Sequence, residues 1–181
     1  MKFLFRIYDR LLRTHPAKTQ ILTTATVMLS SDLMTQKLVE RRDSIDVQRA
    51  VRFFLVGLAY SGPTQRAWLI LMDKRLVRST GPVATVKKLV LDQLAFAPVS
   101  VFGFLGVLGV LQGRNMADIE RSIREKYSTM MKTFYKLWPV AQIINFRYVP
   151  LPYRLLYANC VSLVWNTYTS WKANRFDPQE L

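Results

Sequence analysis

The chain has 181 residues, half of them hydrophobic, with only 7 glycines and 8 prolines. This length predicts a single domain over residues 1–181, and the composition excludes a low-complexity or disordered chain. Lysine and arginine number 26 against 12 aspartates and glutamates, a net charge of +14, which leaves three classes: a nucleic-acid binder, a ribosome-associated protein, or a membrane protein with basic loops.

The distribution of the basic residues favours the membrane protein. They fall in groups between apolar runs, as in residues 2–18, 37–52 and 66–88, which is typical of loops between membrane spans. A nucleic-acid binder would combine clustered lysine and arginine with exposed aromatic residues, whereas the aromatic residues here lie within the apolar runs. We therefore expect the lipid bilayer as a partner and no direct binding of nucleic acid.

Residues 3–14 are predicted to form an amphipathic helix. Apolar residues recur on one side at helical spacing and arginines lie on the other: Leu4, Ile7, Tyr8 and Leu11 against Arg6, Arg10 and Arg13. The segment is similar to a mitochondrial presequence but lacks serine and a clear cleavage zone. We expect an uncleaved helix that lies in the membrane interface.

Three further segments read as helices that enter the bilayer. The first covers residues 19–39 and carries Asp32 and Gln36 one turn apart. The second covers residues 47–72, where Gly62-Pro63 is expected to bend or break the helix. The third is the clearest span, because residues 93–112 are 20 consecutive uncharged residues, about the length that a bilayer core requires. Its glycines at positions 103, 106 and 109 predict close approach of another helix.

The remaining chain reads as a polar helical loop over residues 114–133 and two more helices. The fourth segment is expected to begin at Trp138-Pro139, with proline at its first position, and the fifth covers residues 153–171. Each has a polar and an apolar side by helical spacing. The polar sides carry Trp138, Gln142 and Asn145 in the fourth segment, and Asn159, Ser162, Asn166 and Thr169 in the fifth.

These segments predict an all-α fold: a transmembrane helix bundle with about four spans and an N-terminal amphipathic helix.

Cys160 is the only cysteine, so no intramolecular disulfide forms, and we expect its thiol to be buried among apolar residues.

The residues offer little for catalysis. A triad would have to include His15, the only histidine, and it lies outside every polar cluster. One histidine and one cysteine exclude the usual zinc sites, and the chain has no phosphate-binding glycine loop. We expect no enzyme, no metal site, no catalytic residues and no cofactor.

Several motifs fall at the spacing of a known family. They are His15-Pro16, Asp32, Gln36, Asp46-x-x-Arg49-x-x-Arg52, Gly62-Pro63, Trp68, Asp92-Gln93, Pro98, Trp138-Pro139, Gln142, Asn145-Phe146, Val149-Pro150, Arg154 and Trp165. Over almost its whole length the chain resembles the Mpv-seventeen family, also called the peroxisomal membrane protein family of twenty-two kilodaltons, and most closely its mitochondrial inner-membrane member. It departs from the family pattern at Ser31, Arg66, Leu69 and Tyr135.

The resemblance implies a small protein of the mitochondrial inner membrane, with the peroxisomal membrane as the alternative. It also implies a channel that moderates membrane potential and supports mitochondrial DNA maintenance and its nucleotide supply. Small anionic metabolites or nucleotides are then candidate solutes, and a homo-oligomer is a candidate assembly. The family motif further implies structural roles for Trp138, Pro139, Phe146, Pro150 and Trp165.

Two functions remain open at this point. In the first, a pore or carrier, polar residues line or gate a path through the bundle: Asp32, Gln36, Asp92, Gln93, Gln142, Asn145 and Arg154. In the second, a structural or scaffold protein of the membrane, the same residues form hydrogen bonds between helices, and Asp92 neutralises Arg49, Arg52 or Arg154 across the bundle.

Overall fold

The computed structural model describes the backbone of residues 2–174 and the side chains of residues 6–172, and this part of the chain is helical with short connections. The N-terminal helix is α1 (Lys2–Thr14). Five long helical rods follow, several of them interrupted by a wide π-helical turn (η). They are α2 (Pro16–Met34) with η1 (Thr35–Val39); α3 (Val47–Val56), η2 (Gly57–Ser61), α4 (Gly62–Leu71) and η3 (Met72–Leu76); α5 (Pro82–Leu91), η4 (Asp92–Phe96) and α6 (Ala97–Leu111); α7 (Met116–Tyr148); and α8 (Leu151–Asn174).

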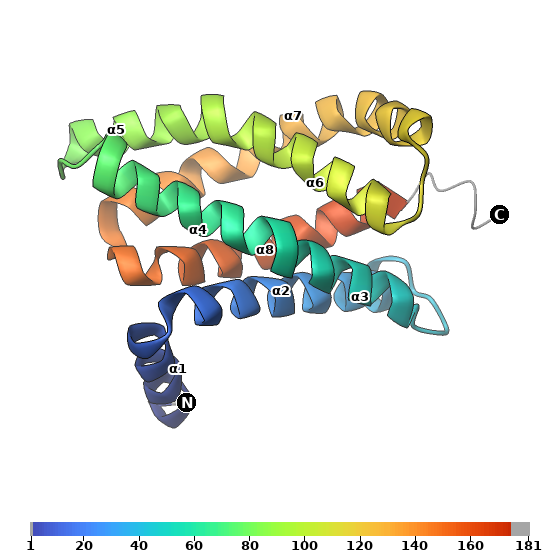
Figure 1. The fold of residues 1–181 in the computed structure, drawn as a ribbon, viewed down its shortest axis with the longest axis horizontal. Helices are drawn as coiled ribbons and strands as arrows, with labels where there is room; N and C mark the ends of the chain where they lie inside the picture. The colour runs from blue at the N-terminus through green and yellow to red at the C-terminus, as the bar shows by residue number, and fades with distance from the viewer. Residues whose placement is uncertain (1, 175–181) are drawn as a thin grey trace.

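The five rods lie side by side and alternate in direction along the chain (Figure 1). One end of the bundle therefore holds the α1–α2 junction, the η3–α5 loop and the α7–α8 junction. The opposite end holds the η1–α3 and α6–α7 loops and the end of α8. Helix α1 leaves the bundle at a steep angle to the rods (Figure 1). If the rods run along the membrane normal, α1 lies near the membrane plane.

The helix starts follow from local sequence. Asp46 precedes α3 and its Oδ1 accepts a hydrogen bond from the Arg49 backbone N–H at 2.8 Å. Asn115 does the same for Asp118 at the start of α7, at 2.9 Å. These side chains satisfy N–H groups that have no partner within the helix. Helices α2 and α5 begin instead at Pro16 and Pro82, residues whose missing N–H costs nothing at that position.

Prolines inside the rods are accommodated in two ways. Pro63 and Pro98 each follow a π-helical turn, η2 and η4, which widens the helix before a residue that cannot donate its N–H and clashes with the preceding turn. The predicted break at Gly62-Pro63 is thus a local widening of a continuous rod. Pro139 lies inside α7, so the prediction of a helix that begins there is wrong. Residues 116–133 are the first half of the same helix.

The apolar third rod also begins earlier than residues 93–112. It starts at Pro82 and includes Lys87, Lys88 and Asp92. The sequence placed these charged residues outside the span because it did not show their partners. Lys88 and Asp92 are both buried in the folded bundle.

Two glycines of this rod permit close contact between helices, as predicted. A Cβ on Gly103 would collide with the Tyr60 hydroxyl, and a Cβ on Gly109 would lie 2.7 Å from Ile119 Cγ1. A Cβ on Gly106 would meet nothing within 4 Å. The tightest backbone contact is elsewhere, at Gly57 of η2, where a Cβ would lie 2.6 Å from Ala25 Cα of α2.

The bundle places many polar residues inside and many aliphatic residues outside. In α8, Asn159, Ser162 and Thr169 are buried, whereas Val164 is 67% exposed. In α7, Gln142 and Asn145 are buried and Val140 on the other side is 62% exposed. The predicted polar and apolar sides of these two helices are confirmed. A hydrophobic core is also buried, for example Phe53 and Met72, but the exposed aliphatic residues between the polar ends suit an apolar surrounding.

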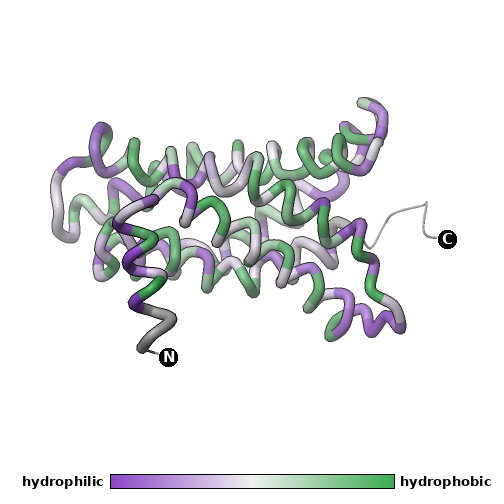
Figure 2. The backbone as a smooth tube through the Cα atoms, turned by 60° about the horizontal axis from the view of Figure 1, so that its bottom comes forward, coloured by the Kyte–Doolittle hydropathy of each residue, from purple (hydrophilic) through white to green (hydrophobic). Residues whose placement is uncertain are grey.

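Figure 2 shows hydrophilic segments at the connections at both ends of the bundle, and hydrophobic stretches mixed with less hydrophobic ones along the rods between them. Within the described residues, one rod is long and apolar enough to span a membrane by composition alone, residues Pro82–Leu111.

Cys160 is exposed, so the prediction of a buried thiol is wrong: it lies on the outward side of α8, one turn before Val164.

Candidate functional site

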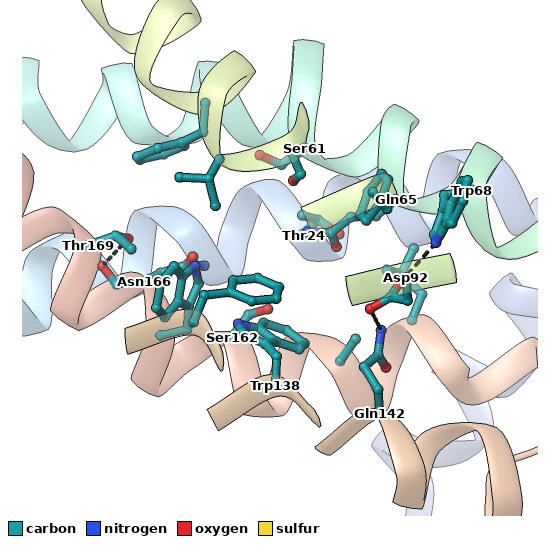
Figure 3. A pocket seen from close by; sticks show the side chains of 18 of the residues that line it. Thr24, Ser61, Gln65, Trp68, Asp92, Trp138, Gln142, Ser162, Asn166 and Thr169 are labelled. Carbon is teal, nitrogen blue, oxygen red and sulfur yellow. Dashed lines mark hydrogen bonds between the residues drawn. The ribbon is translucent and has the colours of Figure 1, made fainter. Parts of the chain in front are cut away.

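A cavity lies inside the bundle and takes residues from all five rods (Figure 3). Its volume is about 70 Å³, measured over the positions open to the centre of a water molecule. Since one water needs about 10–15 Å³ on that measure, the cavity has room for roughly five. Its lining residues with a polar side-chain atom are Thr24, Ser61, Gln65, Trp68, Asp92, Ser100, Trp138, Gln142, Asn145, Ser162, Trp165, Asn166 and Thr169.

Asp92 is held in this cavity by donors from three rods. Trp68 Nε1 of α4 donates to its Oδ1 at 2.9 Å. Gln142 Nε2 of α7 and Gln93 Nε2 each donate to its Oδ2 at 3.0 Å. Asn145 Nδ2 in turn donates to Gln142 Oε1 at 3.0 Å. The convergence of Trp68, Asp92 and Gln142 is visible in Figure 3.

Asp92 is the only charged residue among those that line the cavity, and its side chain is 1% exposed. No arginine or lysine among the described residues pairs with it. Hydrogen bonds from neutral donors stabilise a carboxylate less than a cation does. Asp92 is thus the one ionisable side chain on the described cavity lining, and neutral donors hold both of its oxygens.

Three other lining side chains have polar atoms that are buried without a hydrogen-bond partner within the described structure: Gln65 Oε1, Trp138 Nε1 and Asn145 Oδ1. Leaving such an atom unsatisfied costs about 1–3 kcal/mol. These two acceptors and one donor belong to side chains that line the same cavity.

A second polar cluster lies at the α3 end of the bundle and is internally paired. Arg49 Nε donates to Asp32 Oδ1 at 2.8 Å, and its other nitrogens bond both oxygens of Glu40 at 2.8 and 2.9 Å. Gln36 Nε2 donates to Asp32 Oδ2 at 2.8 Å and to the Asp46 carbonyl at 3.0 Å. Ser170 of α8 joins both Arg49 and Asp32. This cluster ties α2, α3 and α8 together.

A third cluster lies at the opposite end. Asp73 of η3 receives Lys88 of α5 and Arg154 of α8, with nitrogen–oxygen distances of 2.6 and 2.5 Å. Arg154 Nε also donates to the Val149 carbonyl at 3.0 Å, and its guanidinium lies 5.6 Å from the Phe146 ring centre. This cluster fixes the turn between α7 and α8 against the third rod.

A pocket of about 380 Å³ lies beside α1 and shares Leu69 with the central cavity. Arg66 and Gln20 form a hydrogen bond at its inner side, and Gln20 Nε2 donates to the Pro152 carbonyl at 3.2 Å. Arg66, one of the departures from the family pattern, thus lines this pocket and not the central cavity.

The structure separates the seven candidate pore residues. Asp92, Gln142 and Asn145 line the central cavity, and Gln93 bonds Asp92 beside it. Asp32 and Gln36 belong to the α3-end cluster, and Arg154 belongs to the cluster with Asp73. The expectation that Asp92 neutralises Arg49, Arg52 or Arg154 is wrong. Arg49 pairs instead with Asp32 and Glu40, and Arg154 pairs with Asp73, contacts that the sequence did not reveal.

The family-motif residues lie around this framework. Trp138 and Trp165 line the cavity and both contact Phe134: Trp138 stacks on it with ring centres 5.4 Å apart, and Trp165 meets it edge to face at 5.3 Å. Phe146 is buried beneath Arg154, Pro150 lies between α7 and α8, and Pro139 lies within α7.

Sequence reasoning assigned no site role to Gln65, Lys88 or Asp73. Gln65 lies in an uncharged run, and Lys88 reads as an ordinary loop residue when its partner is unknown. A signal existed for Trp68, whose spacing after Gly62-Pro63 matched the family motif. No group of three or more histidine, cysteine, aspartate or glutamate residues suited to a metal occurs in the described part of the chain.

An all-helical bundle that buries many polar side chains beside its hydrophobic core, and exposes many aliphatic ones, defines the class: a helical membrane protein. A model of the Mpv17/PMP22 family matches residues 109–170. The chain is 39% identical to the mitochondrial inner membrane protein Mpv17 of Mus musculus, over 96% of this chain and 99% of the relative. It is 40% identical to the Homo sapiens protein of that name, over 95% and 98%, and 33% identical to the protein SYM1 of Gibberella zeae, over 94% and 98%.

The chain therefore belongs to the Mpv17/PMP22 family, and its location is the mitochondrial inner membrane. No solved structure matches it.

Proposed function

We propose that this protein is a channel or carrier-like protein that moves small polar solutes across the mitochondrial inner membrane. The observation that carries the proposal is the central cavity, to which all five rods contribute polar side chains and where one buried carboxylate, Asp92, has no cationic partner. A purely structural interior would gain by pairing or omitting such a group. The proposal requires no catalytic chemistry.

We further propose that all five rods cross the membrane, where the sequence suggested about four spans. Each rod has 24 residues or more, counted from its bounds, and about 20 suffice for a bilayer core. Their outer surfaces expose aliphatic side chains, for example Val99 at 67% and Val140 at 62%. The polar first half of α7 lies along α6, where Ile119 packs at Gly109 and the Tyr127 hydroxyl donates to the Pro98 carbonyl.

The charge of the cavity narrows the solute class. Resemblance to the family suggested anionic metabolites or nucleotides, yet the only ionisable side chain on the described cavity lining is a carboxylic acid, Asp92, and no basic side chain lines the cavity. We propose that the path through the cavity favours small cations and neutral polar molecules. Flux of this kind would moderate the membrane potential, and through it the protein would support mitochondrial DNA maintenance.

The alternative is a structural protein of the membrane without transport. The observation that favours it is the α3-end cluster, where Asp32, Glu40 and Arg49 are mutually paired. Such a cluster holds helices in register and conducts nothing.

Purified protein in liposomes distinguishes the two. Under a defined potential, we expect potassium flux to exceed chloride flux, and Asp92→Asn to reduce that preference several-fold because the only lining charge is removed. Asp118→Asn is the matched control, since Asp118 is exposed at the start of α7, away from the cavity. Well-folded protein that leaves the liposomes impermeable to both ions would favour the structural alternative.

A further inference from the structure

A pocket of about 230 Å³ lies at the α1 end of the bundle, between the start of α5 and the α7–α8 junction. Its lining is Ser79, Thr80, Gly81, Ala84, Thr85, Lys88, Phe146, Arg147, Tyr148, Val149, Pro150 and Arg154. It shares no residue with the central cavity. We infer that this pocket binds the phosphate group of an anionic phospholipid, a role separate from solute movement.

The first argument is the balance of buried charge. Lys88 is 4% exposed and Arg154 is 8% exposed, and both rest on one carboxylate, Asp73. Asp92 lies one turn from Lys88, but its oxygens accept from Trp68, Gln93 and Gln142. Two buried cations on one anion leave a positive charge without a counter-ion, which is costly away from water. A phosphate group would supply that counter-ion.

The second argument is the supply of hydrogen-bond donors. Helix α5 begins at Pro82 after Gly81, and no side chain caps it, so the first backbone N–H groups after Pro82 lack partners within the helix beside this pocket. A helix N-terminus favours phosphate through these N–H groups and the helix dipole. Exposed Arg147 and the hydroxyls of Ser79 and Thr80 stand at the same pocket.

The third argument is the orientation of Arg154. Its nitrogens are fixed by the Val149 carbonyl at 3.0 Å, the Phe146 carbonyl at 3.4 Å and Asp73 at 2.5 Å. A guanidinium has five N–H groups, so donors remain for a further acceptor. A side chain already held in place loses little entropy when it binds.

The surroundings favour a lipid over free phosphate as the source. The pocket lies at the first turn of the rod Pro82–Leu111, the one apolar enough to span a membrane, and therefore at the level of the headgroups. Val83, Val86 and Tyr148 are 70%, 58% and 73% exposed beside it. These side chains offer an apolar flank to acyl chains, and free phosphate would make no use of them.

Native mass spectrometry of the full chain in detergent tests the inference with two probes, phosphatidylglycerol and phosphatidylcholine of identical acyl chains. We expect one phosphatidylglycerol to bind at least tenfold more tightly than phosphatidylcholine. Arg147→Gln should weaken it about three- to tenfold and Lys88→Gln should abolish the preference. Arg121→Gln, an exposed charge at the opposite end of the bundle, should change nothing.

Lys88→Gln removes one partner of Asp73, so a loss of folding would make its lipid affinity unmeasurable. Arg147 lies on the exposed rim, and Arg147→Gln then tests the inference by itself. Equal affinity for the two lipids, or equal weakening by Arg147→Gln and Arg121→Gln, would overturn the inference. A third probe, inorganic phosphate, should fail to displace the lipid at millimolar concentration. Displacement of the lipid would identify free phosphate as the ligand and overturn the assignment to a lipid.

Discussion

Buried charges in this protein are stabilised by partners that are distant in sequence. Arg49 is 3% exposed and bonds Asp32, Glu40 and Ser170. Either Asp32 or Arg49, if buried without the other, would strongly destabilise the fold, because its charge would have no partner in an apolar interior. The residues therefore act as a unit that fixes three helices at one end of the bundle.

Arg49→Met should lower the free energy of unfolding by about 3–5 kcal/mol, because it leaves Asp32 buried without its cation. Circular dichroism of the protein in detergent, recorded at increasing denaturant concentration, measures the loss in free energy of unfolding. Arg52→Met, one turn further along α3 and partly exposed, is the control and should change stability by less than about 1 kcal/mol. An equal loss in both variants would mean that the cluster does not stabilise the fold.

Glu40 makes stability depend on pH. Burial raises the pKa of Glu40, but hydrogen bonds and charges from Arg49 and Arg42 outweigh it, so its pKa is lowered from the ordinary 4.5. A carboxylate with a lowered folded pKa stabilises the fold above its unfolded pKa and loses that effect as the pH falls through the folded one.

We therefore expect the melting temperature in detergent to be constant above about pH 5.5 and to fall below pH 4.5. Glu40→Gln should melt lower at pH 7 and show a smaller fall at acid pH, since it lacks the titrating group. Parallel melting curves for the two proteins from pH 7 to pH 3.5 would contradict this role of Glu40.

At the scale of elements, the rods depend on a few close approaches. The nearest is between Gly57 of η2 and Ala25 of α2, and backbone cannot yield there as a side chain can. The π-helical turns before Pro63 and Pro98 show how a rod stays continuous past a proline.

Gly57→Ala should destabilise the bundle by about 1–3 kcal/mol, because the new methyl would lie 2.6 Å from Ala25 Cα and force α2 and η2 apart. Gly106→Ala makes the same chemical change where nothing lies within 4 Å, and we expect it to be neutral or stabilising. Comparing the melting temperatures of the two variants in one detergent isolates the effect of the Gly57–Ala25 contact on stability. Equal behaviour would show that the helices adjust freely.

At the scale of the whole molecule, the alternating rods determine topology. The start of α2 and the end of α8 lie at opposite ends of the bundle (Figure 1). If all five rods cross the membrane, these two points face opposite compartments.

Single cysteines at Lys18 and Lys172, in a Cys160→Ser background, test this arrangement. A maleimide that cannot cross membranes should label only one of them in sealed vesicles of uniform orientation, and both after the vesicles are opened. Labelling of both positions from the same side would require an even number of spans and would contradict the five-span proposal.

The sequence by itself determined the all-helical class, the apolar rod around residues 93–112 and the polar and apolar sides of the last two helices. It could do so because helical periodicity is a local property: residues three and four apart share a side whatever lies opposite. It also placed Asp92, Gln142 and Asn145 among the residues of interest.

Only the tertiary structure decided which charges meet. The sequence could not show that Arg49 pairs with Asp32 and Glu40, that Arg154 and Lys88 share Asp73, or that Asp92 keeps neutral partners in a cavity. Nor could it show that α7 continues through Pro139. These outcomes depend on contacts between helices far apart in the chain, where burial makes each unpaired charge costly and leaves few acceptable arrangements.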